Sequence, residues 1–242
     1  MLSYRNSFIK QIKNVRFYNT DDIYKRILNN EDREYYKNMY SDWLKYKPQT
    51  LKYFPISMNS EDAYMSAVKS DGTNLKYLTK ISNLKELSKL GVLQNGLALK
   101  YVPKNLCDLE ICTTAVKQNG AALEFVPKKL NNIDLCNLAI QNNGTSIKFV
   151  PKKYYSDSLF QKAVNSNPKA LQYIPDKYKT YEMCFNAVKN NVHSLCYVPD
   201  KLKTKEMCHY AVAVNGWVIT DVPKHLHSDE LYKIAYRYHY LK

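Results

Sequence analysis

Glycine, long apolar runs and arginine are all scarce in this 242-residue chain. With only 6 glycines, the sequence has no glycine-rich loop of the kind that cradles phosphates. Its apolar runs fall far short of the roughly 20 residues that cross a bilayer, so we expect no membrane partner. No recurring pair of carboxylates and no Ser-His-Asp order is found, so we expect no enzyme, no small-molecule substrate and no cofactor.

A proline that returns every 24 residues is the strongest pattern in the chain. A fixed period of this size is typical of a repeat protein, in which each short module buries its apolar side against the next one. Thr79 fills the single slot that lacks the proline. The periodic prolines are Pro55, Pro103, Pro127, Pro151, Pro175, Pro199 and Pro223.

Each repeat predicts a helix that begins five residues after the proline slot. In the unit after Pro103, Ile111, Cys112, Ala115 and Val116 fall on one helical face. An Asn-Gly pair follows in most units, and we expect its glycine to take the left-handed conformation that ends many helices. Residues suited to cap the helix N-terminus are Ser60, Asp108, Asn132, Ser156, Thr180, Thr204 and Ser228, with Leu84 as the exception.

A second, shorter segment lies between that glycine and the next proline, as in 122–126. Leu123 and Val126 have a helical spacing, whereas Leu123 and Phe125 alternate as in a strand. Because proline cannot donate to a ladder of strands, we favour a short α or 3₁₀ helix. A strand at this segment, as in a leucine-rich-repeat-like α/β solenoid, is the alternative.

The sequence therefore predicts an all-α solenoid of about eight to nine 24-residue repeats, each with a helix and a short α or 3₁₀ helix. We assign residues 1–50 to an N-terminal cap and a degenerate repeat. Residues 51–228 form the repeat array, and residues 229–242 form a C-terminal capping helix. Solenoids need such caps because their end repeats have one neighbour only.

Four of the six cysteines, Cys112, Cys136, Cys184 and Cys208, share one repeat position. Equivalent residues of stacked helices lie about 8–10 Å apart, which is too far for a disulfide. We interpret them as small buried apolar residues of a cytoplasmic protein, and we expect no metal site. A zinc site formed by His225 and His227, with Cys208 and His209 of the preceding repeat, is the weaker hypothesis.

Aromatic residues also share a repeat position, beside aliphatic neighbours. This pattern favours packing between repeats over the stacking of nucleic-acid bases. The residues are Tyr53, Tyr77, Tyr101, Phe125, Phe149, Tyr173 and Tyr197.

The net charge of +14 is spread over the whole chain, and lysines recur just after the prolines. In a stacked array such lysines form a basic ladder, which Asp176 and Asp200 interrupt. Only 5 of the 36 basic residues are arginine, the residue best suited to bidentate phosphate recognition. The candidate binding residues are Lys104, Lys128, Lys129, Lys152, Lys153, Lys177 and Lys201.

The residues Asn119 to Pro127 and Cys208 to Val212 carry a family resemblance. They resemble the uncharacterised repeat modules, with the motif N-G-x-x-L-x-Y-V-P, of amoebal giant viruses and some intracellular bacteria. The resemblance covers about residues 50 to 236 and implies a viral protein of the host cytoplasm or the virion. It implies no catalytic residue.

Two functions remain open from the sequence. The first is a non-enzymatic scaffold that binds a protein partner along an extended solenoid face. The alternative is a nucleic-acid- or ribosome-associated protein, whose lysine ladders bind the phosphates of RNA or DNA.

Overall fold

The computed structural model describes residues 61–78 and 81–240. The chain divides into two compact units, Met1–Ser70 and Asp71–Lys242. In the first unit the described residues form helix α4 (Glu61–Ser70), which buries Ala63, Tyr64, Ala67 and Val68. The predicted cap and degenerate repeat, residues 1–50, lie outside the described residues.

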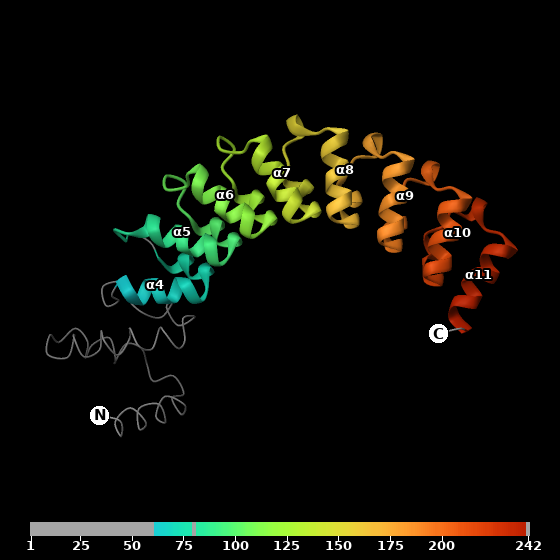
Figure 1. Ribbon diagram of the computed structural model, residues 1–242, viewed down its shortest axis with the longest axis horizontal. Coiled ribbons are helices and arrows are strands. Elements are labelled where there is room, and N and C mark those ends of the chain that lie inside the picture. The colour runs from blue at the N-terminus through green and yellow to red at the C-terminus, as the bar shows by residue number, and fades with distance from the viewer. Residues whose placement is uncertain (1–60, 79–80, 241–242) are drawn as a thin grey trace, which may run out of the picture. The chain divides into compact units, whose positions relative to one another are not determined.

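The second unit is a succession of like repeats, each with an α-helix and a six-residue 3₁₀ helix (Figure 1). Its α-helices are α5 (Leu84–Gln94), α6 (Leu109–Gln118), α7 (Ile133–Asn142), α8 (Asp157–Ser166), α9 (Tyr181–Asn190), α10 (Lys205–Val214) and α11 (Asp229–Tyr240). The six-residue 3₁₀ helices are η3 (Gly72–Tyr77), η4 (Gly96–Tyr101), η5 (Gly120–Phe125), η6 (Gly144–Phe149), η8 (Pro168–Tyr173), η10 (Val192–Tyr197) and η12 (Gly216–Asp221). From the fourth of these on, a 3₁₀ turn follows each proline: η7 (Lys152–Tyr154), η9 (Asp176–Tyr178), η11 (Asp200–Leu202) and η13 (Lys224–Leu226).

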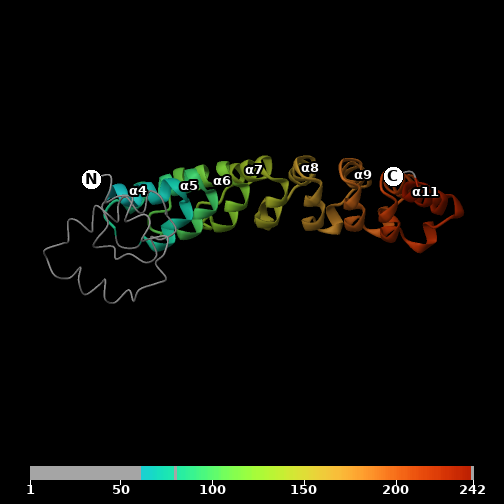
Figure 2. The same cartoon turned by 90° about the horizontal axis from the view of Figure 1, so that it is seen from below.

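Two layers run along this unit, one of α-helices and one of six-residue 3₁₀ helices (Figure 2). Each α-helix from α5 to α10 contacts the next, and each six-residue 3₁₀ helix contacts the next of its kind. In α6 the side chains of Ile111, Cys112, Ala115 and Val116 are fully buried, as the helical spacing predicts. The core is therefore built between neighbouring repeats, and the all-α solenoid is confirmed.

The predicted N-caps are confirmed at six helices. Asp108 Oδ1, for example, accepts a hydrogen bond from the Ile111 amide at 3.0 Å, and Asn132 Oδ1 accepts one from the Leu135 amide at 2.9 Å. At the exception, helix α5 begins at Leu84, and its N-cap residue Asn83 makes no side-chain cap bond. Polar caps thus fix where the six helices α6 to α11 start.

The short segment before each proline is a 3₁₀ helix, so the alternative with a strand is wrong; the described residues contain no strand. The residue before each segment, Asp71 for η3 and an asparagine for the others, explains why a 3₁₀ helix forms. Asn119 Oδ1 accepts from the Ala121 amide at 3.0 Å, and the Asn119 carbonyl accepts from the Ala122 amide at 2.9 Å. These two bonds start a turn of the i to i+3 type immediately after the α-helix ends.

The expectation of left-handed glycines is wrong, because Gly96 and Gly120 lie outside that backbone region. Their small size serves close packing instead. A Cβ atom on Gly96 would overlap the carbonyl oxygen of Ala115, and one on Gly120 would overlap that of Ala139. In both cases the alanine belongs to the next repeat, so glycine and alanine together let the two layers approach.

Side-chain amides tie neighbouring repeats together at the start of the array. Gln94 Oε1 accepts from the Gly72 amide at 2.7 Å, and Gln118 Oε1 accepts from the Gly96 amide at 2.6 Å. Asn142 Oδ1 does the same for Gly120 at 2.7 Å. Each bond satisfies a backbone donor that would otherwise stay unpaired at the 3₁₀ N-terminus.

Candidate binding surface

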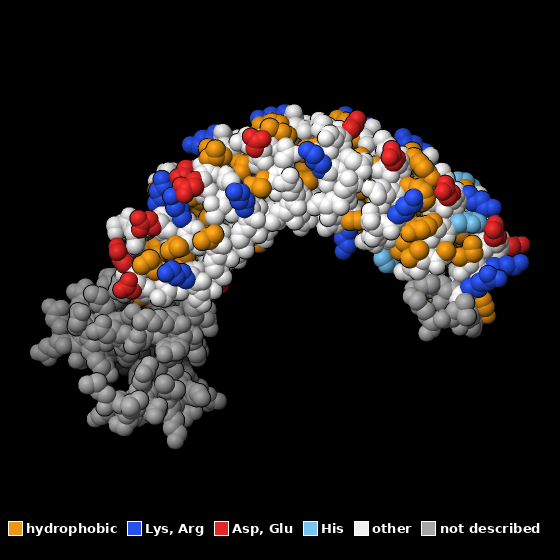
Figure 3. Space-filling model, viewed as in Figure 1, with side chains coloured by type: hydrophobic (Ala, Val, Ile, Leu, Met, Phe, Trp, Pro, Cys, Tyr) orange, Lys and Arg blue, Asp and Glu red, His pale blue; other side chains and the backbone are white. Residues whose placement is uncertain are grey.

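The lysines singled out from the sequence lie in the loops and turns that follow the prolines, along the convex edge of Asp71–Lys242 (Figure 1). All seven are exposed. Basic side chains recur along this edge in Figure 3, with acidic side chains between them. We call this set the lysine rim: Lys104, Lys128, Lys129, Lys152, Lys153, Lys177 and Lys201.

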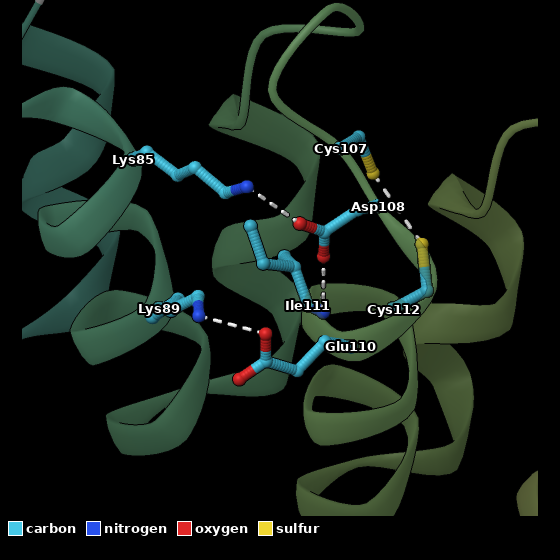
Figure 4. Close-up of polar contacts among 7 residues, drawn as sticks. All are labelled: Lys85, Lys89, Cys107, Asp108, Glu110, Ile111 and Cys112. Carbon is cyan, nitrogen blue, oxygen red and sulfur yellow. Dashed lines mark hydrogen bonds and ion pairs between the residues drawn. The ribbon is translucent and has the colours of Figure 1, made fainter.

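Two acidic residues at the start of α6 form ion pairs with lysines of the preceding repeat (Figure 4). Lys85 Nζ lies 3.0 Å from Asp108 Oδ2, and Lys89 Nζ lies 2.7 Å from Glu110 Oε2. The bond from the Ile111 amide and the ion pair with Lys85 lower the pKa of Asp108. None of the rim lysines is in an ion pair with a described residue, so their charges remain available to a partner.

Asp176 and Asp200, which interrupt the lysine ladder in the sequence, have their own counter-charges. Lys179 Nζ lies 2.9 Å from Asp176 Oδ1, and Lys203 Nζ lies 3.0 Å from Asp200 Oδ1. Both lysine side chains are only 7% exposed. The negative charges of Asp176 and Asp200 are therefore balanced by Lys179 and Lys203. The exposed lysines on either side leave the rim with a net positive charge in these turns.

The sequence pattern did not identify Lys179 and Lys203, although both lysines donate hydrogen bonds that join one repeat to the next. Lys179 Nζ donates to the carbonyl of Tyr197 at 2.8 Å, and Lys203 Nζ donates to that of Asp221 at 2.7 Å. Each carbonyl lies two residues before the next proline, so these bonds join consecutive proline turns. We call them the lysine staples.

The shared aromatic position is half-buried, so its rings are not part of the fully buried core, and their packing between repeats stays a prediction. Tyr173 is 37% exposed, and Tyr77, Tyr101, Phe125, Phe149 and Tyr197 have intermediate exposure. A lysine ammonium lies over several of these rings. Lys76 Nζ is 4.7 Å from the Tyr77 ring centre, and Lys148 Nζ is 4.6 Å from the Phe149 ring centre. A row of aromatic and basic side chains thus runs along the ends of the six-residue 3₁₀ helices, next to the lysine rim in sequence.

Cys112, Cys136, Cys184 and Cys208 are fully buried, as predicted. Burial raises the pKa of Cys136 and of Cys184 to about 11. The sequence reasoning missed Cys107, whose Sγ lies 3.4 Å from that of Cys112 within the same repeat (Figure 4). The next repeat places Asn131 in the same way, with its Oδ1 3.2 Å from Cys136 Sγ, so the five-residue spacing brings these two positions together.

His227, one of the histidines of the weaker zinc hypothesis, makes contacts other than with a metal ion. His227 Nδ1 lies 2.7 Å from the Tyr232 hydroxyl, and His227 Nε2 lies 3.1 Å from the Val222 carbonyl. In residues 61–78 and 81–240, no three His, Cys, Asp or Glu side chains are grouped to hold a metal ion. Over the same ranges, no helix has both the length and the apolarity that crossing a membrane requires.

The model of a family described as a domain of unknown function (DUF4116) matches residues 85–131, 108–155 and 159–203. Each match covers close to two of the 24-residue repeats. The matches are consistent with an uncharacterised repeat family. No curated protein and no solved structure matches the chain.

Proposed function

We propose that this chain is a non-enzymatic repeat scaffold that binds an acidic protein partner along the lysine rim. The observation that carries the proposal is the charge balance of the rim. Its seven lysines are exposed and have no ion pair among the described residues, while Asp176 and Asp200 are paired with the staple lysines. A surface that keeps uncompensated charge of one sign attracts partners of the opposite sign.

The repeat architecture favours an extended partner. Each repeat adds a lysine-bearing turn to the convex edge, so affinity can build from many weak contacts. A single exposed ion pair contributes only about 0.2–1 kcal/mol, and several such pairs are needed for useful affinity. An acidic segment that runs along several repeats meets that need.

The type of basic residue favours a protein partner over nucleic acid. Between residues 61 and 240 the sequence contains a single arginine, Arg237, which lies outside the rim. Arginine provides the bidentate contacts that recognise phosphates and guanine, whereas lysine acts as a flexible point charge. Lysine alone suits the carboxylates of an acidic segment.

A nucleic-acid- or ribosome-associated role is the second candidate, and the aromatic row favours it. Half-exposed rings at one position of successive repeats, with lysines beside them, are the ingredients of a surface for single-stranded RNA or DNA. The lysines already above Tyr77, Tyr101 and Phe149 would have to move for a base to stack there. For this reason we place this role second.

The resemblance to modules of amoebal giant viruses and intracellular bacteria supports a proposal about where the protein acts. We propose a viral protein that acts in the host cytoplasm or in the virion. The matching family is described as a domain of unknown function, so it gives no argument for or against an enzymatic activity.

Co-purification with matched variants tests the proposed function. The first variant reverses four rim lysines to glutamate: Lys128, Lys129, Lys152 and Lys153. The control variant reverses four exposed lysines outside the rim, Lys117, Lys162, Lys169 and Lys189, and therefore has the same net charge. Each tagged chain is captured from the cells that make it, with and without nuclease.

We expect an acidic protein to co-purify with the wild-type chain and with the control, but not with the rim variant. Recovery of the same protein with the rim variant would contradict the proposal. Loss of all partners after nuclease treatment would replace it by the second candidate.

A further inference from the structure

Two thiols face each other inside one repeat. Cys107 lies in the loop after Pro103, and Cys112 lies in the first turns of α6; their Sγ atoms are 3.4 Å apart (Figure 4). Other repeats fill the same two positions differently. Asn131 faces Cys136 with 3.2 Å between Oδ1 and Sγ, and His227 faces Tyr232. By sequence, the pair of thiols occurs in a single repeat.

The two thiols differ in acidity. The hydrogen bond between the two thiols lowers the pKa of Cys107, and Lys129 adds a smaller effect in the same direction. The same hydrogen bond, together with burial, raises the pKa of Cys112. Cys107 is therefore the sulfur that ionises first, and the thiolate is the form that attacks a disulfide.

The exposure of the two side chains indicates the same order of reaction, with Cys107 first and Cys112 second. Cys107 is 9% exposed, whereas Cys112 is 0% exposed. A reagent therefore meets Cys107 first. Cys112 then reacts only with the Cys107 sulfur, after Cys107 has formed a mixed disulfide with the reagent.

We propose that Cys107 and Cys112 are an oxidisable dithiol, which a low-molecular-weight disulfide converts into an intramolecular disulfide. In the first step Cys107 attacks one sulfur of the reagent, forms a mixed disulfide and releases one reagent thiol. In the second step Cys112 attacks the Cys107 sulfur and releases the other reagent thiol. The protein loses two hydrogen atoms and two electrons, and the reagent gains them as two thiols.

The movement required is small. A disulfide bond is about 2.05 Å long, so the sulfur atoms must approach each other by about 1.3 Å from their present 3.4 Å. The new bond would fasten the loop of residues 103–108 to helix α6. That loop carries Lys104 of the rim and the N-cap residue Asp108, so oxidation would fix both relative to the helix.

Mass spectrometry of the full chain tests this proposal. The exposed Cys196 is first replaced by serine, which leaves five of the six cysteines. The folded protein is incubated with oxidised glutathione, quenched with acid, and alkylated after denaturation. Trypsin leaves Cys107 and Cys112 in one peptide, residues 105–117, because no lysine or arginine lies between them.

We expect five free thiols to fall to three, and the peptide 105–117 to lose the mass of two hydrogen atoms. Cys136, Cys184 and Cys208 should remain alkylated. In the Cys112→Ser variant, a stable mixed disulfide with glutathione should accumulate on Cys107. In the Cys107→Ser variant, Cys112 should remain unmodified.

Three results would overturn the proposal. The first is a Cys107 that stays reduced at glutathione concentrations that fully oxidise a flexible dithiol peptide. The second is glutathione on Cys112 in the Cys107→Ser variant. The third is a cross-link from Cys107 to Cys136 in place of Cys112.

Discussion

Lys179 Nζ lies 2.8 Å from the carbonyl oxygen of Tyr197, which is the last residue of η10. This bond holds the turn after Pro175 against the segment that enters the turn after Pro199. Lys203 repeats the arrangement one unit later, with the Asp221 carbonyl. The convex edge in this half of the array is thus built on two buried lysines, which support the exposed ones.

Replacing Lys179 by methionine should destabilise the array, because the Tyr197 carbonyl loses its donor while the side-chain volume stays similar. Loss of one partner of such a bond costs about 1–3 kcal/mol. Urea unfolding of the Lys179→Met variant measures this loss. A Lys201→Met variant is the control, since Lys201 is exposed. Equal unfolding midpoints for the two variants would show that the staple contributes nothing.

Replacing Gly96 by alanine should also destabilise the protein, because the added Cβ would overlap the carbonyl oxygen of Ala115. Overpacking of this kind costs about 1–3 kcal/mol. The neighbouring change Leu97→Ala removes a half-exposed side chain without adding an atom near the next repeat. Thermal unfolding of both variants should show the larger decrease for Gly96→Ala, and a stability gain there would contradict the account of close packing.

Asp108 should make stability depend on pH. Its pKa is lowered in the folded state, so its stabilisation is present above the unfolded pKa of about 3.9 and is lost as the pH falls through the folded value. The Asp108→Asn variant keeps a capping oxygen but cannot titrate. The stability difference between wild type and this variant should therefore shrink between neutral pH and acid.

Chemical denaturation at a series of pH values measures that difference. The Asp108→Ala variant, which lacks both the cap and the ion pair with Lys85, should lose about 1 kcal/mol at neutral pH. A wild-type advantage over Asp108→Asn that stays constant down to acid pH would show that the carboxylate charge has no role.

The helices were predictable because their determinants are local. Asp108 and Asn132 carry caps, and the apolar spacing of Ile111, Cys112 and Ala115 fits one helical face. The second element was predicted as a short helix for a similar reason, since a proline follows it. Because the same caps, apolar spacing and prolines recur in most repeats, a single sequence is enough to predict the fold class.

The rings at the shared aromatic position are half-exposed for a geometric reason that the sequence spacing does not reveal. A 3₁₀ helix has three residues per turn, so Leu123 and Val126 point into the same layer and are buried. Phe125 lies between them on the turn and is left half-exposed. The sequence spacing alone fits a strand or an α-helix equally well, and each would place the ring differently.

The lysine staples and the cysteine pair escaped prediction because their partners leave no pattern. The acceptor of Lys179 is a backbone carbonyl, which every residue has. The partner of Cys112 lies five residues away, a spacing that belongs to a loop and a helix together and to neither alone. Contacts of this kind become visible only when the repeat is seen in three dimensions.

The most direct test of the lysine rim is a binding titration with a labelled glutamate-rich peptide. The wild-type chain, the variant with Lys128, Lys129, Lys152 and Lys153 changed to glutamate, and the control with the same net charge are compared at physiological salt. Four lost ion pairs, at about 0.2–1 kcal/mol each, predict at least about a fourfold weaker affinity for the rim variant alone. Equal weakening of both variants would contradict the account, because binding would then follow net charge and not the rim.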